Sequence, residues 1–524
     1  MRRANDRCIF NPFSPTACGR SEVGWVERIE PHQMDVSRPG GARCARPTLR
    51  LHAPYVLLLL LTPLTASGQT PPPKPEDQVP TTKLVVRPAA EPRAPLHDAL
   101  LPSSLDRRPG NAATAYGRVI ALLSQTHSDK TAEKVPGWLE LPLEKFPREE
   151  VRKALTSHWQ SVLKELDSAA RRERCDWELP LGQSNVFTMV LPELSTMREL
   201  GRLVALQAKL QIADGRTEEA IHTLQTGYAL GRHMGQGQTL IHGLVGVAIC
   251  QTMSARVEEL LQQPGTRNLY WTLTVLPQPL IDMRPGLDIE MHSVYFGFPW
   301  LRDVDRSRND LPYWQNLIDK TERELGDVMF SGPAKPKAGY RPAVVAMALI
   351  GYPLAKRVLI ERGFSAAEAG AMPVPKVIFL ATMQNYEEAR DQMFKWFALP
   401  YWEARPGLER FDRNMLTEVR HREIVPLASL LLPAVSAVKF AIARNDRSIA
   451  LLRTVEALRI YGAAHEGRLP EKLADVTEVP LPIDPITGQA FSYRKAGDMA
   501  VIEAPAPAGR PQSQGRRLEI QFAK

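Results

Sequence analysis

The chain has 524 residues, of which 44% are hydrophobic and 24% are charged, so it is long enough for about two to four domains that each bury a core. The formal net charge of +8 is spread along the chain, without a block of Lys and Arg or a basic stripe interleaved with aromatic residues. This distribution argues against nucleic acid as a partner. The 45 prolines gather near the N-terminus and between helical segments, which indicates a punctuated helical chain with a tether.

An apolar run near the N-terminus has the pattern of a secretory signal. Residues 55–61 read YVLLLLL, with basic residues upstream and small residues downstream. The flanking residues are Arg43, Arg46 and Arg50 before the run and Ala66 and Gly68 after it. This order predicts export with cleavage after Gly68, so that residues 1–68 form an N-terminal extension and signal sequence.

Two alternatives stay open for this segment. The run is shorter than the roughly 20 apolar residues that a spanning helix needs, but an uncleaved segment at residues 55–68 would anchor the protein to a membrane. A start at Met34 would give a signal of ordinary length, because residues 1–54 otherwise precede the apolar run. In each case we expect the protein in the periplasm, the cell envelope or the extracellular space.

The next segment, residues 69–110, is rich in proline and contains the stretches TPPPKPEDQVP and RPAAEPRAP. Proline fixes φ and removes a backbone donor, so the segment is predicted to be an extended, partly disordered linker. A short strand is expected within it at residues 83–87.

Residues 111–265 carry strong helical periodicity. Apolar side chains repeat every three or four positions over residues 149–175, and further helices are predicted at residues 194–213, 218–233 and 240–261. The helix at 240–261 is apolar nearly all round, so we expect it to be buried between neighbouring helices.

The helices at 194–213 and 218–233 resemble one tetratricopeptide repeat. Two small residues would let the helices approach closely, a glycine opens the turn, and two more residues fall at packing positions. The matching residues are Ala208, Gly215, Ala220, Leu224 and Gly227. Gln211 stands where an aromatic residue is usual in that repeat, and no proline closes the unit near Arg232. The resemblance implies repeat-like antiparallel helical hairpins.

Residues 266–423 form a second helical region that is rich in aromatic residues. Ser365 and Glu368 fit a capping box that opens a short helix, and a longer helix is expected at about residues 376–399. The aromatic side chains could line a groove for a peptide or glycan, although at helical spacing they are more often core anchors. The candidates are Tyr270, Trp271, Trp300, Trp396 and Trp402.

The last segment, residues 424–524, changes character. A long apolar helix is followed by LPIDPITGQAFSYR and MAVIEA, which resembles the helix and small sheet of bacterial pseudopilin-like proteins. The matching residues are 431–435, Asp484, Pro485, Gly488, Phe491 and Tyr493. The charged, processed N-terminus and the long membrane stem of that family are missing. The resemblance implies a helix and hairpin docked on the helical body, followed by a disordered tail.

The region from residue 98 to residue 500 also resembles a group of uncharacterised exported bacterial proteins, through stretches such as RRERCDW and MPVPKVIFL. This resemblance implies no known activity. The expected fold class is mainly α, with tetratricopeptide-like antiparallel helical hairpins and a small C-terminal helix-plus-β-hairpin module.

Motifs of well-known catalytic sites are missing: the sequence has no Walker loop, dinucleotide-binding glycine fingerprint, HExxH, GxSxG or paired CxxC. His222, His233 and His242 are 11 and 9 residues apart, so two of them could share a helix face as zinc ligands. The alternative is that they are ordinary polar or capping histidines. We expect no metal ion and no cofactor.

A second weak metal pattern lies at residues 303–309. Asp303, Asp305, Ser307 and Asn309 alternate as in a calcium loop. However, Arg308 takes the place of the turn glycine and Trp314 that of the bidentate glutamate. A solvated, charged loop is the alternative.

An acidic cluster is the remaining candidate for catalysis. Asp282, Asp288 and Glu290 lie close to His292 in the sequence and could form an acid/base group in a cleft. Residues two apart on a helix do not face each other, so Glu290 and His292 are not expected to cooperate directly. We assign no catalytic residue.

Only Cys175 and Cys250 follow the predicted cleavage point, so the protein has no disulfide framework, and the two either pair or remain as buried thiols. The leading hypothesis is an exported, non-enzymatic helical scaffold that binds protein at the cell envelope. One alternative is an envelope hydrolase that uses the acidic cluster around Asp282 and Glu290. The other is a pseudopilin-like structural subunit.

Overall fold

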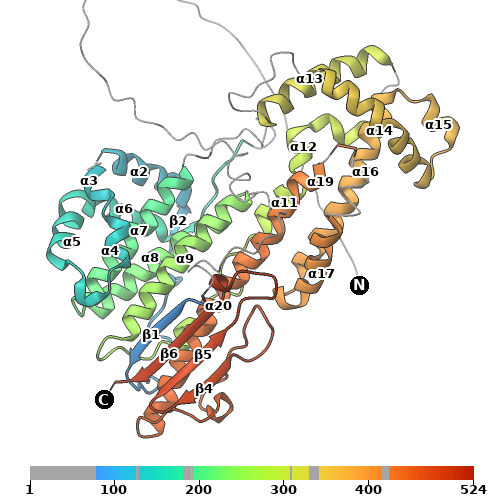
Figure 1. Ribbon diagram of the computed structural model, residues 1–524. Coiled ribbons are helices and arrows are strands. Elements are labelled where there is room, and N and C mark those ends of the chain that lie inside the picture. Colours follow the sequence, from blue (N-terminus) through green and yellow to red (C-terminus); the bar gives the residue numbers. More distant parts are fainter. Residues whose placement is uncertain are drawn as a thin grey trace, which may run out of the picture. The chain divides into compact units, whose positions relative to one another are not determined.

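The computed structural model describes residues 78–125, 129–180, 191, 193–306, 310–329, 341–415, 424–425 and 427–523. The predicted signal at residues 55–68 and the proposed start at Met34 lie outside these residues. Helices make up most of the described chain, and one small sheet is built largely from its C-terminal part (Figure 1). The predicted mainly helical fold with a small C-terminal sheet is therefore confirmed, whereas the tetratricopeptide-like arrangement is not confirmed.

Three consecutive long helices match the predicted ones: α7 (Glu193–Ala213), α8 (Thr217–Gly235) and α9 (Leu240–Leu261). Helix α8 packs against both α7 and α9. Gly215 forms the turn between α7 and α8 with a φ of +73°, a left-handed conformation that residues with a Cβ resist.

Helix α9 is apolar on all sides because most of it is buried, with α7, α8 and α20 (Pro433–Ala464) packed around it. Among the described residues it is the one helix long and apolar enough to cross a membrane, and a buried core helix passes that test as well.

The helix predicted over residues 149–175 is built from three parts: α5 (Arg148–Ala154), a π-helical turn η3 (Leu155–Trp159) and α6 (Gln160–Ala170). Its buried face packs against α2 and α8. Short elements precede and follow it. They are β2 (Arg108–Asn111), α2 (Ala112–Gln125), α3 (Asp129–Ala132), α4 (Val135–Glu140), η2 (Leu143–Lys145) and β3 (Arg172–Arg174), and β2 pairs with β3 in parallel.

The second helical region has a hydrophobic cluster of its own, formed by α14 (Arg341–Glu361), α16 (Val374–Phe394) and residues near α13 (Leu311–Met329). The predicted capping box is present, because the Ser365 backbone N–H donates to Glu368 Oε2 at 2.8 Å and the Glu368 N–H donates to Ser365 Oγ at 3.1 Å. The remaining elements are α10 (Tyr270–Thr274), α11 (Arg284–Met291), α12 (Ser293–Gly297), η4 (Pro299–Arg306), α15 (Ala366–Ala371), η5 (Lys395–Ala398), α17 (Tyr401–Asn414) and α19 (Leu427–Leu431).

The sheet has four strands in the order β1-β6-β5-β4. Strands β4 (Ser492–Ala496) and β5 (Met499–Ala504) form the predicted hairpin, and β6 (Arg516–Phe522) pairs antiparallel with β5. The strand predicted near residues 83–87 is β1 (Thr81–Val86), which lies parallel to β6 at the edge of the sheet, blue beside red in Figure 1.

This pairing corrects two expectations. The described part of the linker is not a free tether, because Leu84 and Val86 of β1 are fully buried on one face of the sheet. The C-terminal segment is not a disordered tail, because Leu518 and Ile520 of β6 alternate with polar residues and are buried on the same face. Both segments gain backbone partners and a buried apolar face, which offsets the entropy lost on ordering. Two short turns, η7 (Leu473–Asp475) and η8 (Gln512–Gln514), complete this region.

The predicted turn at Asp484, Pro485 and Gly488 is attached to helix α20 by an ion pair. The Arg447 guanidinium of α20 donates to both Asp484 oxygens, at 2.8 and 2.6 Å, and both side chains are buried. Asp484 Oδ1 also accepts from the Ile486 N–H at 2.9 Å, and Gly488 adopts a φ of +70°. A buried ion pair with this many hydrogen bonds fixes the turn against the helix.

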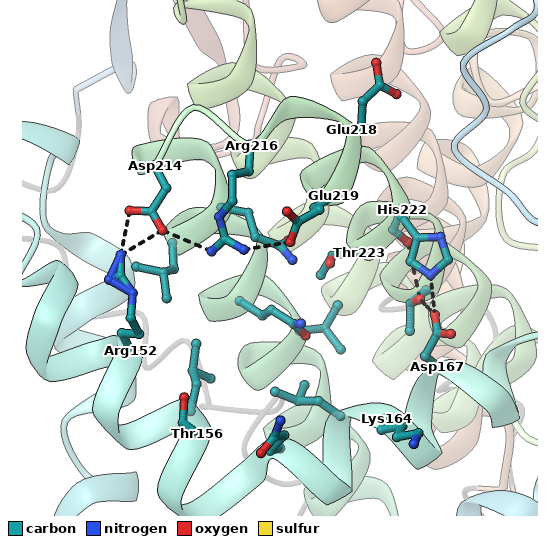
Figure 2. Close-up of a pocket in the computed structure, with 18 residues that line it drawn as sticks. Arg152, Thr156, Lys164, Asp167, Asp214, Arg216, Glu218, Glu219, His222 and Thr223 are labelled. Carbon is teal, nitrogen blue, oxygen red and sulfur yellow. Dashed lines mark hydrogen bonds and ion pairs between the residues drawn. The ribbon is translucent and has the colours of Figure 1, made fainter.

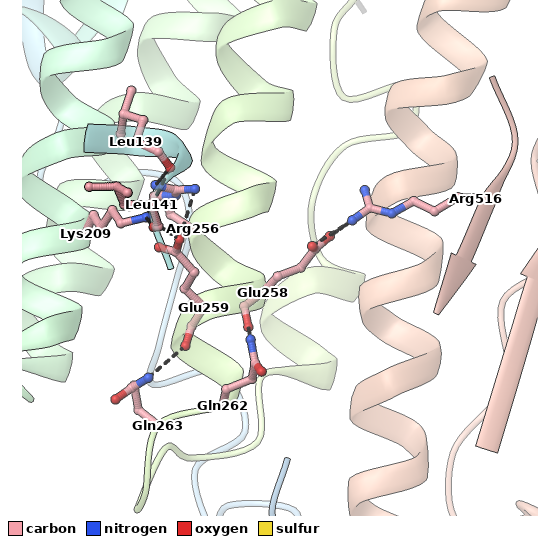
Figure 3. A network of polar contacts seen from close by, with 9 residues as sticks. All are labelled: Leu139, Leu141, Lys209, Arg256, Glu258, Glu259, Gln262, Gln263 and Arg516. Atoms are coloured by element: carbon pink, nitrogen blue, oxygen red, sulfur yellow. Dashed lines mark hydrogen bonds and ion pairs between the residues drawn. The ribbon is translucent and has the colours of Figure 1, made fainter. Parts of the chain in front are cut away.

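A second buried polar network joins α4, α7, α9 and the sheet (Figure 3). Lys209 of α7 is fully buried and donates to Leu139 O at 3.1 Å, to Leu141 O at 2.5 Å and to Glu259 Oε1 at 2.8 Å. Burial lowers the pKa of Lys209, and the carboxylate partner opposes that shift. The adjacent Glu258 accepts from Arg516 of β6 at 2.7 Å. One face of α7 is thereby held in the core, and its opposite face is left to line a cavity.

Candidate binding groove

A groove of about 1060 Å³ lies among α5, the π-helical turn, α6, α7 and α8. Each of these elements contributes side chains at steps of three or four residues, which place them on one helix face. From α5 to α6 these are Arg152, Leu155, Thr156, Gln160, Leu163, Lys164 and Asp167; from α7 and the turn they are Val204, Gln207, Leu210, Gln211 and Asp214; from α8 they include Glu219, His222, Thr223 and Thr226. Figure 2 shows Thr156 and Lys164 on one wall, facing Arg216, Glu219 and Thr223 on the other.

The π-helical turn lies in the wall of this groove, where it presents Leu155 and Thr156. A π turn widens the helix by one residue per turn and occurs mostly as an isolated bulge, often at functional sites. Here it changes the angular position of the side chains between Arg152 and Gln160, both of which still line the groove.

One end of the groove is closed by a chain of ion pairs at the α7–α8 turn (Figure 2). Arg152 NH2 donates to Asp214 Oδ1 and Oδ2 at 2.9 and 2.8 Å, Arg216 NH2 donates to Asp214 Oδ2 at 3.0 Å, and Arg216 NH1 donates to Glu219 Oε2 at 2.6 Å. Burial opposes ionisation of Asp214, but the hydrogen bonds from the two arginines prevail and lower its pKa. This cluster is therefore charged and self-paired at neutral pH.

The other end holds a second polar cluster. Thr226 Oγ1 donates to Asp167 Oδ1 at 2.5 Å, and His222 Nε2 lies 3.1 Å from the same oxygen. Arg171 NH2 lies 3.1 Å from Asp167 as well. Burial raises the pKa of Asp167, but the hydrogen bonds from His222 and Thr226 lower it further than burial raises it. This carboxylate also stays ionised at neutral pH.

The floor between these ends carries a buried amide without a partner. Gln211 is only 6% exposed, and its Oε1 accepts no hydrogen bond among the described residues. Gln207 lies one turn earlier on the same face of α7. A buried carbonyl without a donor costs about 1–3 kcal/mol, and a rotation of the Gln211 side chain toward the groove would let an occupant supply that donor.

The side chain of Lys164 is the unpaired charge of the groove. It is exposed on the wall formed by α6, and none of the described carboxylates forms an ion pair with it. Each carboxylate in the lining has a cation instead, including Glu218, which pairs with Arg267. An occupant with a negative group would therefore find a partner in Lys164.

The three histidines considered for zinc are not gathered in one site. His222 pairs with Asp167 in the groove, whereas His233 and His242 are buried. His233 Nδ1 is 2.7 Å from the Tyr116 hydroxyl, and burial lowers the pKa of His233 to about 4. His242 Nδ1 is 2.7 Å from Thr239 Oγ1 at the start of α9. Within the described ranges, no group of three or more His, Cys, Asp or Glu side chains is placed to hold a metal ion.

The calcium-like pattern is only partly described. Asp303 and Asp305 are exposed on η4, and Ser307 and Asn309 lie outside the described residues. Trp314, which occupies the position of the bidentate glutamate, is fully buried in the second hydrophobic cluster.

The acidic cluster is divided between two places. Asp282 pairs with the exposed Arg284 at 2.6 Å and lines a second cavity, whereas Glu290 is not among the residues that line it. Burial raises the pKa of Glu290 to about 7. His292 and Asp288 form a separate contact near the end of α11, with His292 Nδ1 2.8 Å from Asp288 O.

The aromatic candidates are mainly packing residues. Tyr270 is fully buried, with Trp271 against its edge, and Trp300 packs edge-on against Phe379. Trp402 differs, because it is 38% exposed and lines the second cavity. The two cysteines, Cys175 and Cys250, are free, and burial raises the pKa of both thiols.

Polar residues at helical spacing in the sequence mark this groove, although apolar periodicity alone did not identify it. Gln207 and Gln211 form a polar stripe on α7, a helix that is otherwise largely buried, and Asp214 continues the stripe into the turn that follows. Gln211 stood out only as a departure from the tetratricopeptide pattern, although the same residue marks the groove floor. Comparison of the chain with protein-family models, with curated proteins and with solved structures found no match, so its function is argued from this site.

Proposed function

We propose that this protein is an exported, non-enzymatic helical scaffold that binds an extended peptide segment of a partner protein in the groove between α5–α6, α7 and α8. The observation that carries the proposal is the buried Gln211 oxygen, which has no donor among the described residues and belongs to a side chain that lines an open groove. A backbone N–H of a bound peptide is the donor that would complete it.

The geometry of the floor suits a peptide backbone. Each carboxamide offers one carbonyl acceptor and an amide donor, so Gln207 and Gln211 together present the pairing that a peptide unit needs. The groove floor runs along α7 from Val204 to Asp214 at the turn that follows, and ten residues at helical rise give it a length of about 15 Å. An extended chain covers that length with roughly five residues at about 3.3 Å each.

The charges favour a segment with an acidic side chain. The arginines at the turn are engaged by Asp214 and Glu219, so Lys164 is the cation open to a ligand. An ion pair at this exposed position adds little affinity, about 0–1 kcal/mol, but it discriminates between acidic and basic segments.

The ionisation of the groove supports binding rather than acid/base chemistry. Asp167 and Asp214 have lowered pKa values, whereas a general acid or base works best with a pKa near the pH of operation. Their hydrogen bonds to neighbouring cations keep the two ends of the groove fixed while the floor stays open.

A peptide-library experiment tests the groove. We expect the protein to enrich segments of about five residues that contain Asp or Glu from a displayed random library. A labelled peptide from that selection should bind Gln211→Leu at least tenfold more weakly by fluorescence anisotropy, because a lost hydrogen bond of about 1.4 kcal/mol is a factor of ten.

Matched controls separate the groove from general effects. Gln251→Leu makes the same change on α9, away from the groove, and should leave affinity unchanged. Lys164→Gln should reduce the preference for acidic segments, and Lys153→Gln, on the exposed side of α5, should not. Equal weakening by Gln211→Leu and Gln251→Leu, or a library without enrichment, would contradict the proposal.

Export is tested separately. N-terminal sequencing of protein recovered from the envelope or the medium should begin near Gln69, as the order of basic, apolar and small residues predicts. An intact Met1 terminus on protein confined to the cytosol would remove this part of the proposal and leave the groove untouched.

A further inference from the structure

A second cavity of about 840 Å³ lies along helix α20. It is lined by residues that come later in the sequence than those of the groove. Its other walls come from the loop before α11 with the first turn of that helix (residues 276–284 and 287), from the junction of η5 and α17 (residues 397–402) and from the loop at residues 481–483 and 485. These walls are mainly apolar and rich in proline, and they include the half-exposed Trp402. Cavities of this size with a few polar groups are the usual form of small-ligand sites.

Three charged residues of α20 face this cavity at intervals of seven: Lys439, Asp446 and Arg453. Seven residues are nearly two helical turns, so the three lie on one face at spacings of about 10 Å. Apolar residues separate them on that face, with Ile442 before Asp446 and Ile449 after it.

Arg453 has no carboxylate partner among the described residues. Its NH2 is 3.4 Å from the Tyr270 hydroxyl, and its guanidinium lies 5.4 Å from the centroid of the Tyr270 ring. Its buried Nε has no hydrogen-bond partner within the described part of the chain. The Tyr270 hydroxyl in turn donates to Pro480 O, which holds the ring in place. The guanidinium is thus positioned by stacking, with donors left for an anion.

Asp446 has no cationic partner in the described chain. Its Oδ1 accepts from the Leu280 N–H at 3.2 Å, and burial raises its pKa to about 6. Lys439, two turns away, already donates to Phe397 O at 2.9 Å and Leu399 O at 2.5 Å. Asp446 and Arg453 therefore line one cavity as opposite charges, and neither forms an ion pair with a described residue.

We propose that this cavity binds a short apolar peptide with free termini, with the carboxylate on Arg453, the ammonium on Asp446 and the apolar side chains against Ile449 and Trp402. The ligand must carry opposite charges separated by about the 10 Å that divides the two residues along the helix. An extended peptide of about three residues has that length, at about 3.3–3.6 Å per residue. The site is independent of the groove and of its proposed function.

The charge state of the cavity supports a zwitterion. Asp282 is held ionised by its hydrogen bonds with Arg284 at the rim, so that pair is self-neutralised. Burial lowers the pKa of Lys439 to about 8, so it stays protonated at pH 6. Of the titratable side chains that line the cavity, Asp446 is the one whose charge changes near pH 6.

Isothermal titration calorimetry with the tripeptide alanyl-leucyl-alanine tests the site. The free tripeptide should bind saturably, and its N-acetylated and C-amidated forms should each bind at least tenfold more weakly. Capped forms that bind as tightly as the free tripeptide, or titrations without saturable heat, would overturn the proposal whether or not any variant folds.

Variants assign the two ends. The Arg453→Gln variant should bind the free tripeptide and its C-amidated form with equal affinity. The Asp446→Asn variant should bind the free tripeptide and its N-acetylated form with equal affinity. Arg468→Gln changes an exposed arginine that does not line the cavity and should retain both preferences. Gln211→Leu should leave tripeptide binding unchanged, which separates this site from the groove. Persistence of the preference for the free acid in a folded Arg453→Gln would overturn the assignment of the carboxylate.

Discussion

Replacing Gln211 with leucine should make the protein more stable while it loses peptide binding. The side chain is 6% exposed and its Oε1 has no donor among the described residues, so the folded state carries the penalty of an unsatisfied buried carbonyl. That penalty is about 1–3 kcal/mol. Leucine is of similar size and has no polar atom, and apolar residues such as Val204 and Leu163 already line the same groove. We therefore expect the free energy of unfolding to rise by at least about 1 kcal/mol.

Urea denaturation of wild type, Gln211→Leu and Gln251→Leu measures this change. The control substitution lies on the partly exposed face of α9 and should stay within about 0.5 kcal/mol of wild type. Hydrogen exchange of the α7 amides gives a local reading, because an effect confined to the groove floor should slow exchange in α7 most.

A Gln211→Leu variant that unfolds more easily than wild type would refute the reasoning. It would mean that the amide has a native partner, and a bound peptide would then not be needed to supply the donor. A gain in stability joined to a loss of binding is the pattern expected where a residue is retained for function at the expense of stability.

Three further outcomes follow from the described contacts. Tripeptide binding in the second cavity should weaken as the pH falls through about 6, because protonation of Asp446 removes the charge that holds the ammonium, and Asp446→Asn should make weak binding independent of pH by calorimetry. Ala220→Trp should overpack the buried interface between α7 and α8 and lower the free energy of unfolding by about 1–3 kcal/mol in urea, whereas an unchanged midpoint would show that this interface is misplaced. Gly488→Ala should destabilise more than Gly497→Ala in the same assay, since both have positive φ but only the first would place a Cβ 2.6 Å from the Trp402 ring; equal effects would contradict that contact.

Local patterns predicted the helices well. The helices α7, α8 and α9 follow from apolar residues at three- and four-residue steps, and Gly215 marks the turn that separates the first two. The capping box at Ser365 and the Asp484 turn were predicted for the same reason, because each depends on residues within four positions of one another.

Contacts between segments far apart in the sequence could not be predicted from local patterns. The pairing of β1 with β6 joins segments such as Thr82 and Arg516, which are 434 positions apart and are linked by a hydrogen bond at 3.3 Å. The sequence of a short strand does not specify which distant strand it pairs with. For this reason β1 was predicted as part of a linker and β6 as part of a disordered tail. The cavity along α20 escaped prediction because its charged residues lie in a helix that resembled a pseudopilin stem.

The parallel pairing of β1 with β6 has a consequence for the order in which the chain acquires its structure. β6 lies between β1 and β5, so the sheet is split until β6 has been synthesised. Closing a loop of this length is entropically expensive, and contacts between distant segments slow folding. In the folded protein the Ala89 N–H also donates to Arg459 O, so the segment that follows β1 is held to α20 as well as to β6. A nascent chain in which β6 has not yet been synthesised would therefore expose the unpaired edges of two strands. During this interval a holding chaperone would be needed.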